Sequence, residues 1–268
     1  MAKTEKIAIY GKGGIGKSTI ASLLSSAYAK KGEKVLHVGC DPKQDSTITL
    51  MGEFITNTVL DLCLHKESIN KKDIINKGRL NIDCIECGGP KAGVGCAGRG
   101  ITRMFEILEE LSLLKDYNIS VFDVLGDVVC GGFAAPMREG FAQKVIIVVS
   151  EEMMSLYAAN RIIEAINMYK HNGVYLGGLV LNYRNNSADT SHVERFAKLT
   201  NTNIICKVPR AKEIIECEKG YKNIISESPE SHIAQIIYKL ADDIENLNQK
   251  DLPPSKHIKE LDFNSVLK

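Results

Sequence analysis

The chain has 268 residues, of which 44% are hydrophobic and 25% charged, with a formal net charge of +1. This composition is typical of a soluble globular protein, and the near-neutral charge argues against a general nucleic-acid-binding protein, which carries a basic surplus. No stretch approaches the ~20 uninterrupted apolar residues of a membrane helix, and we expect no signal peptide ahead of the first predicted strand. We therefore expect a cytoplasmic protein with no membrane or nucleic-acid partner.

Short apolar runs alternate with helical patterns along the whole chain. The runs predict strands at 5–10, 34–39, 82–86, 119–124, 144–150, 176–182 and 203–208. Helices are predicted at 17–31, 99–115, 153–171, 190–200, 210–217 and 229–247. This alternation indicates an α/β fold with a doubly wound, mainly parallel sheet covered on both faces. No linker divides residues 1–250, so we expect a single domain there. The tail at 251–268 is either an arm packed on the surface or on a partner chain, or a frayed end.

Residues 11–18 fit the phosphate-loop pattern G-x-x-x-x-G-K-S/T, between an apolar run and a helical segment. Backbone N–H groups and the helix N-terminus attract phosphate, Lys17 reaches the β- and γ-phosphates, and the Ser18 hydroxyl can bind Mg²⁺. The early Lys12 in the string KGGIGK is of the deviant-Walker type. It is either a solvated charge or a second cation that is offered to the phosphates across a dimer interface. The predicted loop residues are Gly11, Lys12, Gly13, Gly14, Ile15, Gly16, Lys17, Ser18 and Thr19.

Acidic residues follow two other predicted strands at the same sheet edge. Asp123 ends an apolar run, which is typical of a Walker-B aspartate that holds Mg²⁺ directly or through water, and Asp123-x-x-Gly126 resembles a γ-phosphate-sensing switch. Hydrolysis needs a carboxylate to orient or deprotonate water. Asp41 and Asp127 are the first candidates and Asp45 the next. The alternative role for these groups is to bond backbone N–H groups of their own loops.

Eight cysteines need an explanation. Cys40, Cys63 and Cys206 lie in or beside apolar segments and are expected to be small buried hydrophobes, whereas Cys217 lies in a charged stretch and has no assigned role. Cys96 and Cys130 are flanked by small residues whose N–H groups suit the thiolates of an iron–sulfur cluster. One chain then supplies half of a four-cysteine site, which a symmetric homodimer completes. Alternatively, Cys84 and Cys87 join Cys96 and Cys130 in an intrachain zinc or iron–sulfur site, and spacing leaves both arrangements open.

Long strings of this sequence resemble the iron protein of nitrogenase and its relatives over roughly residues 4–220: YGKGGIGKST, VGCDPKQDST, GGPKAGVGCAGRG, DVLGDVVCGGFAAP and YAAN. The resemblance implies a homodimeric ATPase that bridges one 4Fe-4S cluster between subunits through Cys96 and Cys130, and not through Cys84 and Cys87. It also implies transfer of single electrons to a larger metalloenzyme, coupled to MgATP hydrolysis, with a ferredoxin or flavodoxin as donor.

The resemblance also assigns roles to single residues. Lys12 matches the lysine that reaches the nucleotide of the opposite subunit, Asp41 and Asp45 the first switch, and Asp123 and Asp127 the second. Asn182, Pro209 and Arg210 fall where the family holds adenine. Arg99 and Arg138 match the surface that docks the partner, and Arg99 is an ADP-ribosylation target in some members.

Several positions depart from the nitrogenase pattern. Gly140-Phe141 and the segment 44–50 lean toward relatives that reduce tetrapyrroles, of the nickel-tetrapyrrole or protochlorophyllide type, while Glu152-Met153-Met154 reads like the nitrogenase branch. Further departures are Lys91-Ala92, Tyr183 and Ala211, and we expect these changes to fall on the partner surface. The favoured function is therefore a nitrogenase reductase or nitrogenase-like reductase, with a tetrapyrrole reductase component as the alternative. A partitioning or scaffold ATPase without electron transfer is a more remote one.

Overall fold

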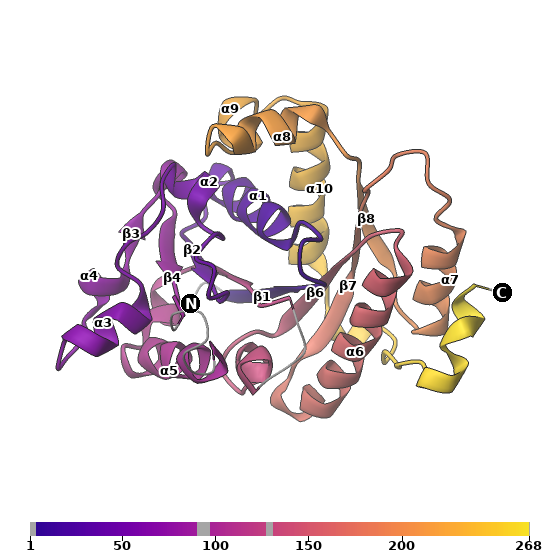
Figure 1. The fold of residues 1–268 in the computed structure, drawn as a ribbon, viewed down its shortest axis with the longest axis horizontal. Coiled ribbons are helices and arrows are strands. Elements are labelled where there is room, and N and C mark those ends of the chain that lie inside the picture. Colours follow the sequence, from indigo (N-terminus) through magenta and orange to yellow (C-terminus); the bar gives the residue numbers. More distant parts are fainter. Residues whose placement is uncertain (1–3, 90–96, 127–130, 268) are drawn as a thin grey trace.

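The computed structural model describes residues 4–89, 97–126 and 131–267. In these residues eight strands form one sheet in the order β3-β4-β2-β5-β1-β6-β7-β8, and every neighbouring pair is parallel except β3–β4 (Figure 1). The strands are β1 (Glu5–Tyr10), β2 (Val35–Gly39), β3 (Asn76–Lys77), β4 (Asp83–Glu86), β5 (Ile119–Asp123), β6 (Lys144–Val149), β7 (Tyr175–Asn182) and β8 (Ile204–Val208).

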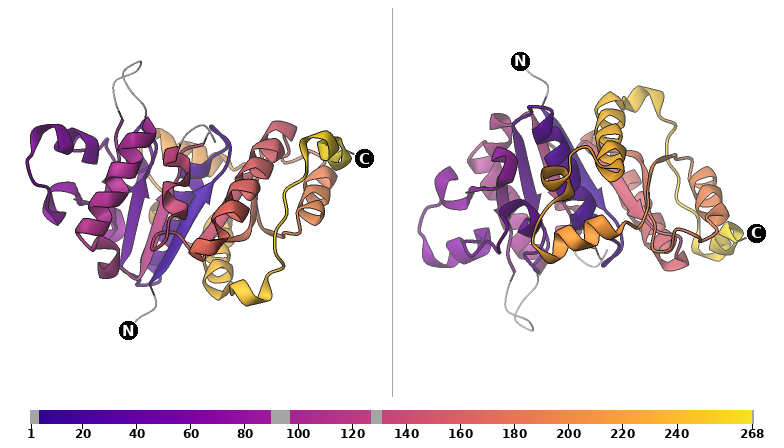
Figure 2. Two further views of the ribbon diagram at one scale, coloured as in Figure 1. Left: turned by 90° about the horizontal axis from the view of Figure 1, so that it is seen from below. Right: turned by 90° about the horizontal axis from the view of Figure 1, so that it is seen from above.

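Helices cover both faces of the sheet, as Figures 1 and 2 show. Side chains alternate along each strand, so β1 sends Ile7 and Ile9 into the core shared with α1 and α10, and Ala8 and Tyr10 into the core shared with α5 and α6. The helices are α1 (Lys17–Lys30), α2 (Ile48–Met51), α3 (Val59–His65), α4 (Lys71–Ile74), α5 (Ala97–Glu110), α6 (Met153–Tyr169), α7 (Ser191–Leu199), α8 (Lys212–Lys219), α9 (Ile224–Glu227) and α10 (His232–Asn246). Within the described residues, no helix has the length and apolar character needed to cross a membrane.

The predicted α/β fold with a mainly parallel sheet is confirmed, and the predicted strands and long helices match observed ones. The helix predicted at 99–115 is shorter than expected: α5 ends at Glu110, and Ser112, with a positive φ of 48°, leads into a 3₁₀ turn at Leu113–Asp116. The short elements α2, α3, α4, α9 and β3 were not predicted. Each has at most seven residues, which is too few for a hydrophobic period to stand out.

The C-terminal tail lies against its own chain, on α6 and α7 (Figure 1). The Asn160 side chain, on α6, donates to the Ile258 carbonyl at 2.8 Å and accepts from the Ile258 N–H at 2.7 Å. Phe263 packs edge-on against Tyr157 and Phe196, and Val266 is fully buried. Of the arrangements considered for the tail, an arm packed on the chain's own surface is the observed one.

The carboxyl ends of the central strands meet at one edge of the sheet. β2 lies between β4 and β5, and Gly39 at its end is in register with Glu86 on one side and Asp123 on the other. Asp123 is in turn in register with Ile9 of β1, one residue before the end of that strand. The loops that follow β1, β2, β4 and β5 therefore start side by side, as expected for ligand sites in doubly wound sheets.

Candidate functional site

The phosphate-loop segment connects β1 to α1, as predicted. Lys17, the first residue of α1, is buried, with 7% of its surface exposed, while Lys12 and Ser18 are half-buried. The carboxyl end of β7 holds the loop in place. The Asn182 side chain donates to the Ile15 carbonyl at 2.8 Å, and the Arg184 guanidinium donates to the Gly14 carbonyl at 2.9 Å.

A cavity of about 260 Å³ opens beside this loop. Asn182, Pro209 and Arg210, which the family resemblance predicts at adenine, all line it together with Thr19 of α1. Glu218 of α8, which the sequence analysis missed, lines the cavity as well and accepts a hydrogen bond from the Thr19 hydroxyl. The cavity therefore brings the loop and the three predicted adenine residues together, and α8 forms one wall.

A second cavity, of about 250 Å³, contains Ser18 and the predicted switch residue Asp45. Asp45 is exposed, whereas Asp41 is half-buried and accepts a hydrogen bond from the Lys43 N–H at 3.0 Å. In this conformation Asp41 thus stabilises its own turn. This is the alternative role given above for these carboxylates, which is to bond backbone N–H groups of their own loops.

Asp123 is buried at the end of β5, with 1% of its surface exposed. Its Oδ2 accepts from the Ser46 hydroxyl at 2.6 Å, whereas Oδ1 has no hydrogen-bond partner within the described part of the chain. Burial raises the pKa of Asp123, and the nearby Lys17 ammonium opposes that rise. A buried carboxylate oxygen without a partner is a hard ligand of the kind that Mg²⁺ or its bound water requires, so the site fits this ion.

Gly126 packs directly on the phosphate loop. A Cβ built at this position would lie 2.6 Å from the Gly13 nitrogen and 3.1 Å from the Lys17 Nζ. Only glycine allows this approach, which places the segment after Asp123 against the loop and its lysine. Asp127, the next residue and a predicted catalytic carboxylate, lies outside the described residues.

Glu86 is a buried carboxylate that the sequence analysis missed. It ends β4 with 1% of its surface exposed, and its Oε1 accepts from both the N–H and the hydroxyl of Thr47 at 2.9 Å. Burial raises the pKa of Glu86 to about 8, although the hydrogen bonds from Thr47 oppose that shift. The rule that found Asp123, an acidic residue at the end of an apolar run, would have found Glu86 too.

The predicted cluster ligands, Cys96 and Cys130, lie outside the described residues, but the segments that follow them meet. Gly98 in the first turn of α5 and Gly132 in the 3₁₀ segment Gly131–Met137 are so close that a Cβ on Gly132 would lie 2.5 Å from the Gly98 Cα. Each cysteine is two residues before one of these glycines. The described structure therefore brings together the two segments that follow the predicted ligands.

The alternative intrachain site is wrong. Cys84 packs in the core on the α1 side of the sheet and Cys87 in the core on the α5 side, so their thiols cannot bind one metal. Among the described residues, no group of three or more His, Cys, Asp or Glu side chains is arranged to hold a metal ion. Cys40 is buried as expected, while Cys63, Cys206 and Cys217 are only half-buried.

The departures from the nitrogenase pattern do not lie together. Phe141 is buried and packs edge-on against Phe105 at a ring distance of 4.7 Å, and Tyr183 and Ala211 line the cavity beside the phosphate loop. The expectation that these changes mark the docking surface is therefore wrong for Phe141 and stays a prediction for Tyr183 and Ala211, and Lys91-Ala92 lies outside the described residues. Arg99 and Arg138, the predicted docking residues, are both exposed.

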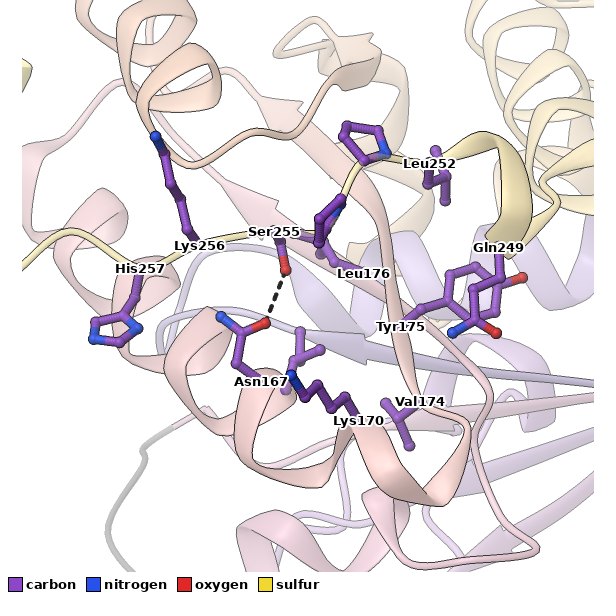
Figure 3. Close-up of a pocket in the computed structure, with 13 residues that line it drawn as sticks. Asn167, Lys170, Val174, Tyr175, Leu176, Gln249, Leu252, Ser255, Lys256 and His257 are labelled. Atoms are coloured by element: carbon purple, nitrogen blue, oxygen red, sulfur yellow. Dashed lines mark hydrogen bonds between the residues drawn. The ribbon is translucent and has the colours of Figure 1, made fainter.

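A further cavity, of about 540 Å³, lies between α6, the start of β7 and the C-terminal tail (Figure 3). The Ser255 hydroxyl donates to the Asn167 side chain across it at 3.3 Å. None of the predicted site residues lines this cavity, because it lies at the amino end of β7, whereas the phosphate loop meets the carboxyl end.

Comparison with known proteins identifies the family. Residues 5–267 match the family described as 4Fe-4S iron sulfur cluster binding proteins, NifH/frxC family. The chain belongs to this NifH/frxC family. It is 43% identical to a nitrogenase iron protein of Methanospirillum hungatei, over 96% of this chain and 94% of that protein. It is 45% identical to nitrogenase iron protein 2 of Methanothermobacter thermautotrophicus, over 90% of this chain and 89% of that protein.

Solved structures agree on the fold of this NifH/frxC family member. The cell division ATPase MinD of Pyrococcus furiosus superposes with a TM-score of 0.74 at 22% identity, covering 92% of this chain and all of that one. At this identity the likeness shows the fold alone, which is that of the P-loop ATPases. The family match, and not the structural likeness, separates this chain from the partitioning ATPases weighed in the sequence analysis.

Proposed function

We propose that the chain is the ATP-hydrolysing reductase component of a nitrogenase or nitrogenase-like system. A homodimer would hold one 4Fe-4S cluster and pass single electrons to a larger metalloenzyme. The proposal rests mainly on the contacts and short sequence distances that connect the phosphate loop to the segments beside the two predicted cluster cysteines. Gly126 packs on Gly13 and Lys17, Cys130 is seven residues beyond Asp123, and Gly132 packs on Gly98 beyond Cys96.

The phosphate loop and Asp123 would hold MgATP. Lys17 and the first turn of α1 face the phosphates, while Ser18 and the free Oδ1 of Asp123 supply the oxygens for Mg²⁺. The bound ion would neutralise phosphate charge during hydrolysis. Asn182, Pro209 and Arg210 would contact adenine in the adjoining cavity. Asp127 and Asp41 are the candidates for orienting water, and Lys12 would reach the nucleotide of the second subunit.

Cys96 and Cys130 would hold the cluster, which supplies one-electron redox chemistry when bound. Since one chain offers two such thiols, two chains related by a twofold axis complete the four ligands. The family match and the contact between Gly98 and Gly132 support this assignment. A ferredoxin or flavodoxin is the proposed electron donor, and the exposed Arg99 and Arg138 would contact the acceptor.

Nucleotide state and cluster position would be coupled by the segment from Asp123 to Cys130. Gly126 and its neighbours would be held in one conformation by contact with the γ-phosphate and would be released on hydrolysis, so that the cysteine segment would have two positions. The two states bind the acceptor with different affinity, which is the requirement for coupling hydrolysis to electron delivery.

The test is ATP-dependent electron transfer by the anaerobically purified chain. We expect acetylene reduction with a nitrogenase catalytic component, dependent on MgATP, for the wild type. The Asp127→Ala variant is expected to bind ATP yet deliver no electrons. Normal electron delivery by that variant would contradict the proposed switch.

The same assay separates the alternatives. Electron delivery only to a tetrapyrrole-reducing component would favour the tetrapyrrole branch. An ATPase that shows no visible chromophore after strictly anaerobic purification would contradict electron transfer altogether and favour a partitioning or scaffold ATPase.

A further inference from the structure

A chain of buried polar side chains links α1 to the end of β5. The Ser25 hydroxyl lies 2.8 Å from His37 Nδ1, His37 Nε2 lies 2.8 Å from the Ser46 hydroxyl, and that hydroxyl donates to Asp123 Oδ2 at 2.6 Å. Each of the four side chains has at most 1% of its surface exposed. Because water does not reach them, their hydrogen-bond partners are these neighbours, and the direction of each bond can be assigned.

The directions follow from the ionised carboxylate of Asp123, the form that binds a metal. A carboxylate only accepts, so the single hydroxyl proton of Ser46 is used toward Asp123. His37 Nε2 must then donate its proton to the Ser46 oxygen, and Nδ1 must accept from Ser25. Burial also lowers the pKa of His37 to about 3, so the ring is neutral at physiological pH.

We propose that His37 is a positioning residue for the metal side of the nucleotide site. This inference rests on the proposed function, because it assigns Asp123 to Mg²⁺. His37 touches neither nucleotide nor metal and acts through Ser46. Its Nε2–H fixes the Ser46 hydroxyl as a donor to Oδ2, which sets the orientation of the Asp123 carboxylate and leaves Oδ1 as the oxygen for the Mg²⁺ shell.

The hydrogen bond between Ser46 and Asp123 also attaches the loop that follows β2 to the end of β5. Ser46 is bonded to Asp123 of β5, and its neighbour Thr47 is bonded to Glu86 of β4. Because β2 lies between these strands, two adjacent residues of one loop span both flanking strand ends. His37 lies on β2 and bonds Ser46, the residue that attaches this loop to Asp123. Loss of His37 therefore loosens the side of the loop that faces Asp123 and leaves the side at Glu86 in place.

The test compares three replacements at position 37 in the full-length chain. Gln places an amide N–H where Nε2 stands and keeps the donation to Ser46, Asn places its amide near Nδ1 and does not reach Ser46, and Leu keeps volume without polarity. The readout is the Mg²⁺ concentration that gives half of the Mg²⁺-dependent binding of a fluorescent ATP analogue, with the thermal unfolding midpoint as the folding control.

We expect His37→Leu and His37→Asn to need at least about tenfold more Mg²⁺, as for other residues that orient metal ligands, and His37→Gln to stay within about threefold of the wild type. Binding of the analogue without Mg²⁺ is expected to be unchanged, since the phosphate loop is intact. A folded His37→Leu protein with wild-type Mg²⁺ dependence, or a His37→Gln protein as impaired as His37→Leu, would overturn the proposal.

A measurement on the wild type covers the case in which the variants do not fold. Nitrogen NMR of the histidine rings reports which ring nitrogen carries the proton. We expect a neutral His37 with its proton on Nε2, and a proton on Nδ1 would reverse every donor in the chain of bonds and overturn the inference. This readout needs no nucleotide, so it is distinct from failure of the proposed function, in which the wild type would show no Mg²⁺-dependent nucleotide binding.

Discussion

At the residue scale, the site is organised by two buried carboxylates on the strands that flank β2. Asp123 and Glu86 are each 1% exposed and each has one oxygen without a hydrogen-bond partner in the described residues. Burying a carboxylate oxygen without a hydrogen-bond partner costs free energy, so the burial of these two side chains indicates a role beyond folding. Asp123 has the proposed metal role, and Glu86 fixes Thr47 of the adjoining loop.

The Glu86→Gln variant is expected to flatten the pH dependence of stability. Because the pKa of Glu86 is raised from 4.5 to about 8, the folded chain keeps a proton that the unfolded chain loses, and stability falls as pH rises across that window. Gln resembles the protonated acid and has no such dependence. Urea unfolding at pH 5 and pH 8 is expected to show that the wild type loses about 1–3 kcal/mol more than the variant. Equal losses would show that Glu86 ionises normally.

The role of a single residue could be predicted from the sequence where a motif surrounds that residue. Asp123 follows an apolar run in a chain with a phosphate loop, and the structure places it beside Lys17. Glu86 could have been found by the rule that found Asp123, whereas His37 belongs to no motif and its importance arises from register and burial, which only the folded sheet sets. Phe141 was misread because an aromatic residue after an exposed glycine gives no sign of whether its ring turns into the core.

At the element scale, the central feature is the contact between α5 and the 3₁₀ segment at Gly131–Met137. Each of these elements follows one of the two predicted cluster ligands, and Gly98 packs directly against Gly132. Long strands and helices of this fold were predictable from hydrophobic periodicity. The contact was not, because it joins segments more than thirty residues apart through two glycines that carry no side-chain signal.

Gly132→Ala is expected to separate these two elements. Its Cβ would lie 2.5 Å from the Gly98 Cα, so backbone must move, at a cost of about 1–3 kcal/mol. Chemical unfolding and iron content after anaerobic purification are both expected to fall. Gly220→Ala is the matched control, because its Cβ meets nothing closer than 3.5 Å. Undiminished iron in Gly132→Ala would show that the contact is unnecessary for the cluster.

One buried side chain of α6, Asn160, bonds the backbone of the C-terminal tail. Asn160→Ala removes both hydrogen bonds to the backbone of Ile258 and leaves buried polar groups without partners, at a cost of about 1–3 kcal/mol. Hydrogen exchange of residues 256–267 is expected to accelerate in this variant. Ser255→Ala, which loses one bond of 3.3 Å to Asn167, is expected to leave exchange nearly unchanged. Equal exchange in Asn160→Ala and the wild type would assign the tail's attachment to Phe263 and Val266 instead.

At the scale of the whole molecule, the proposed dimer explains features that one chain leaves incomplete. Lys12 lies half-buried in the phosphate loop and is proposed to reach the second subunit, and Cys96 and Cys130 would supply half of the proposed cluster site. The P-loop fold and the family were predictable from long sequence strings, since those strings extend over most of the chain. The identity of the acceptor was not, because Tyr183 and Ala211, which depart from the nitrogenase pattern, line the cavity beside the phosphate loop, and Phe141, another departure, lies in the core.

Lys12→Gln is expected to spare the fold and abolish nucleotide-driven closure of the dimer, because the variant loses the charge proposed to cross the interface. Small-angle scattering of the wild type with and without MgATP is expected to show compaction, and the variant the same profile in both states. Compaction of the variant equal to that of the wild type would remove Lys12 from the interface.

The central claim, one cluster shared by two chains through Cys96 and Cys130, is tested most directly by native mass spectrometry of the anaerobically purified protein. We predict a dimer carrying a single 4Fe-4S cluster, retained in the control Cys217→Ser and lost in Cys96→Ala and in Cys130→Ala. A monomer that carries a complete cluster, or a Cys130→Ala protein with its full complement of iron, would contradict it.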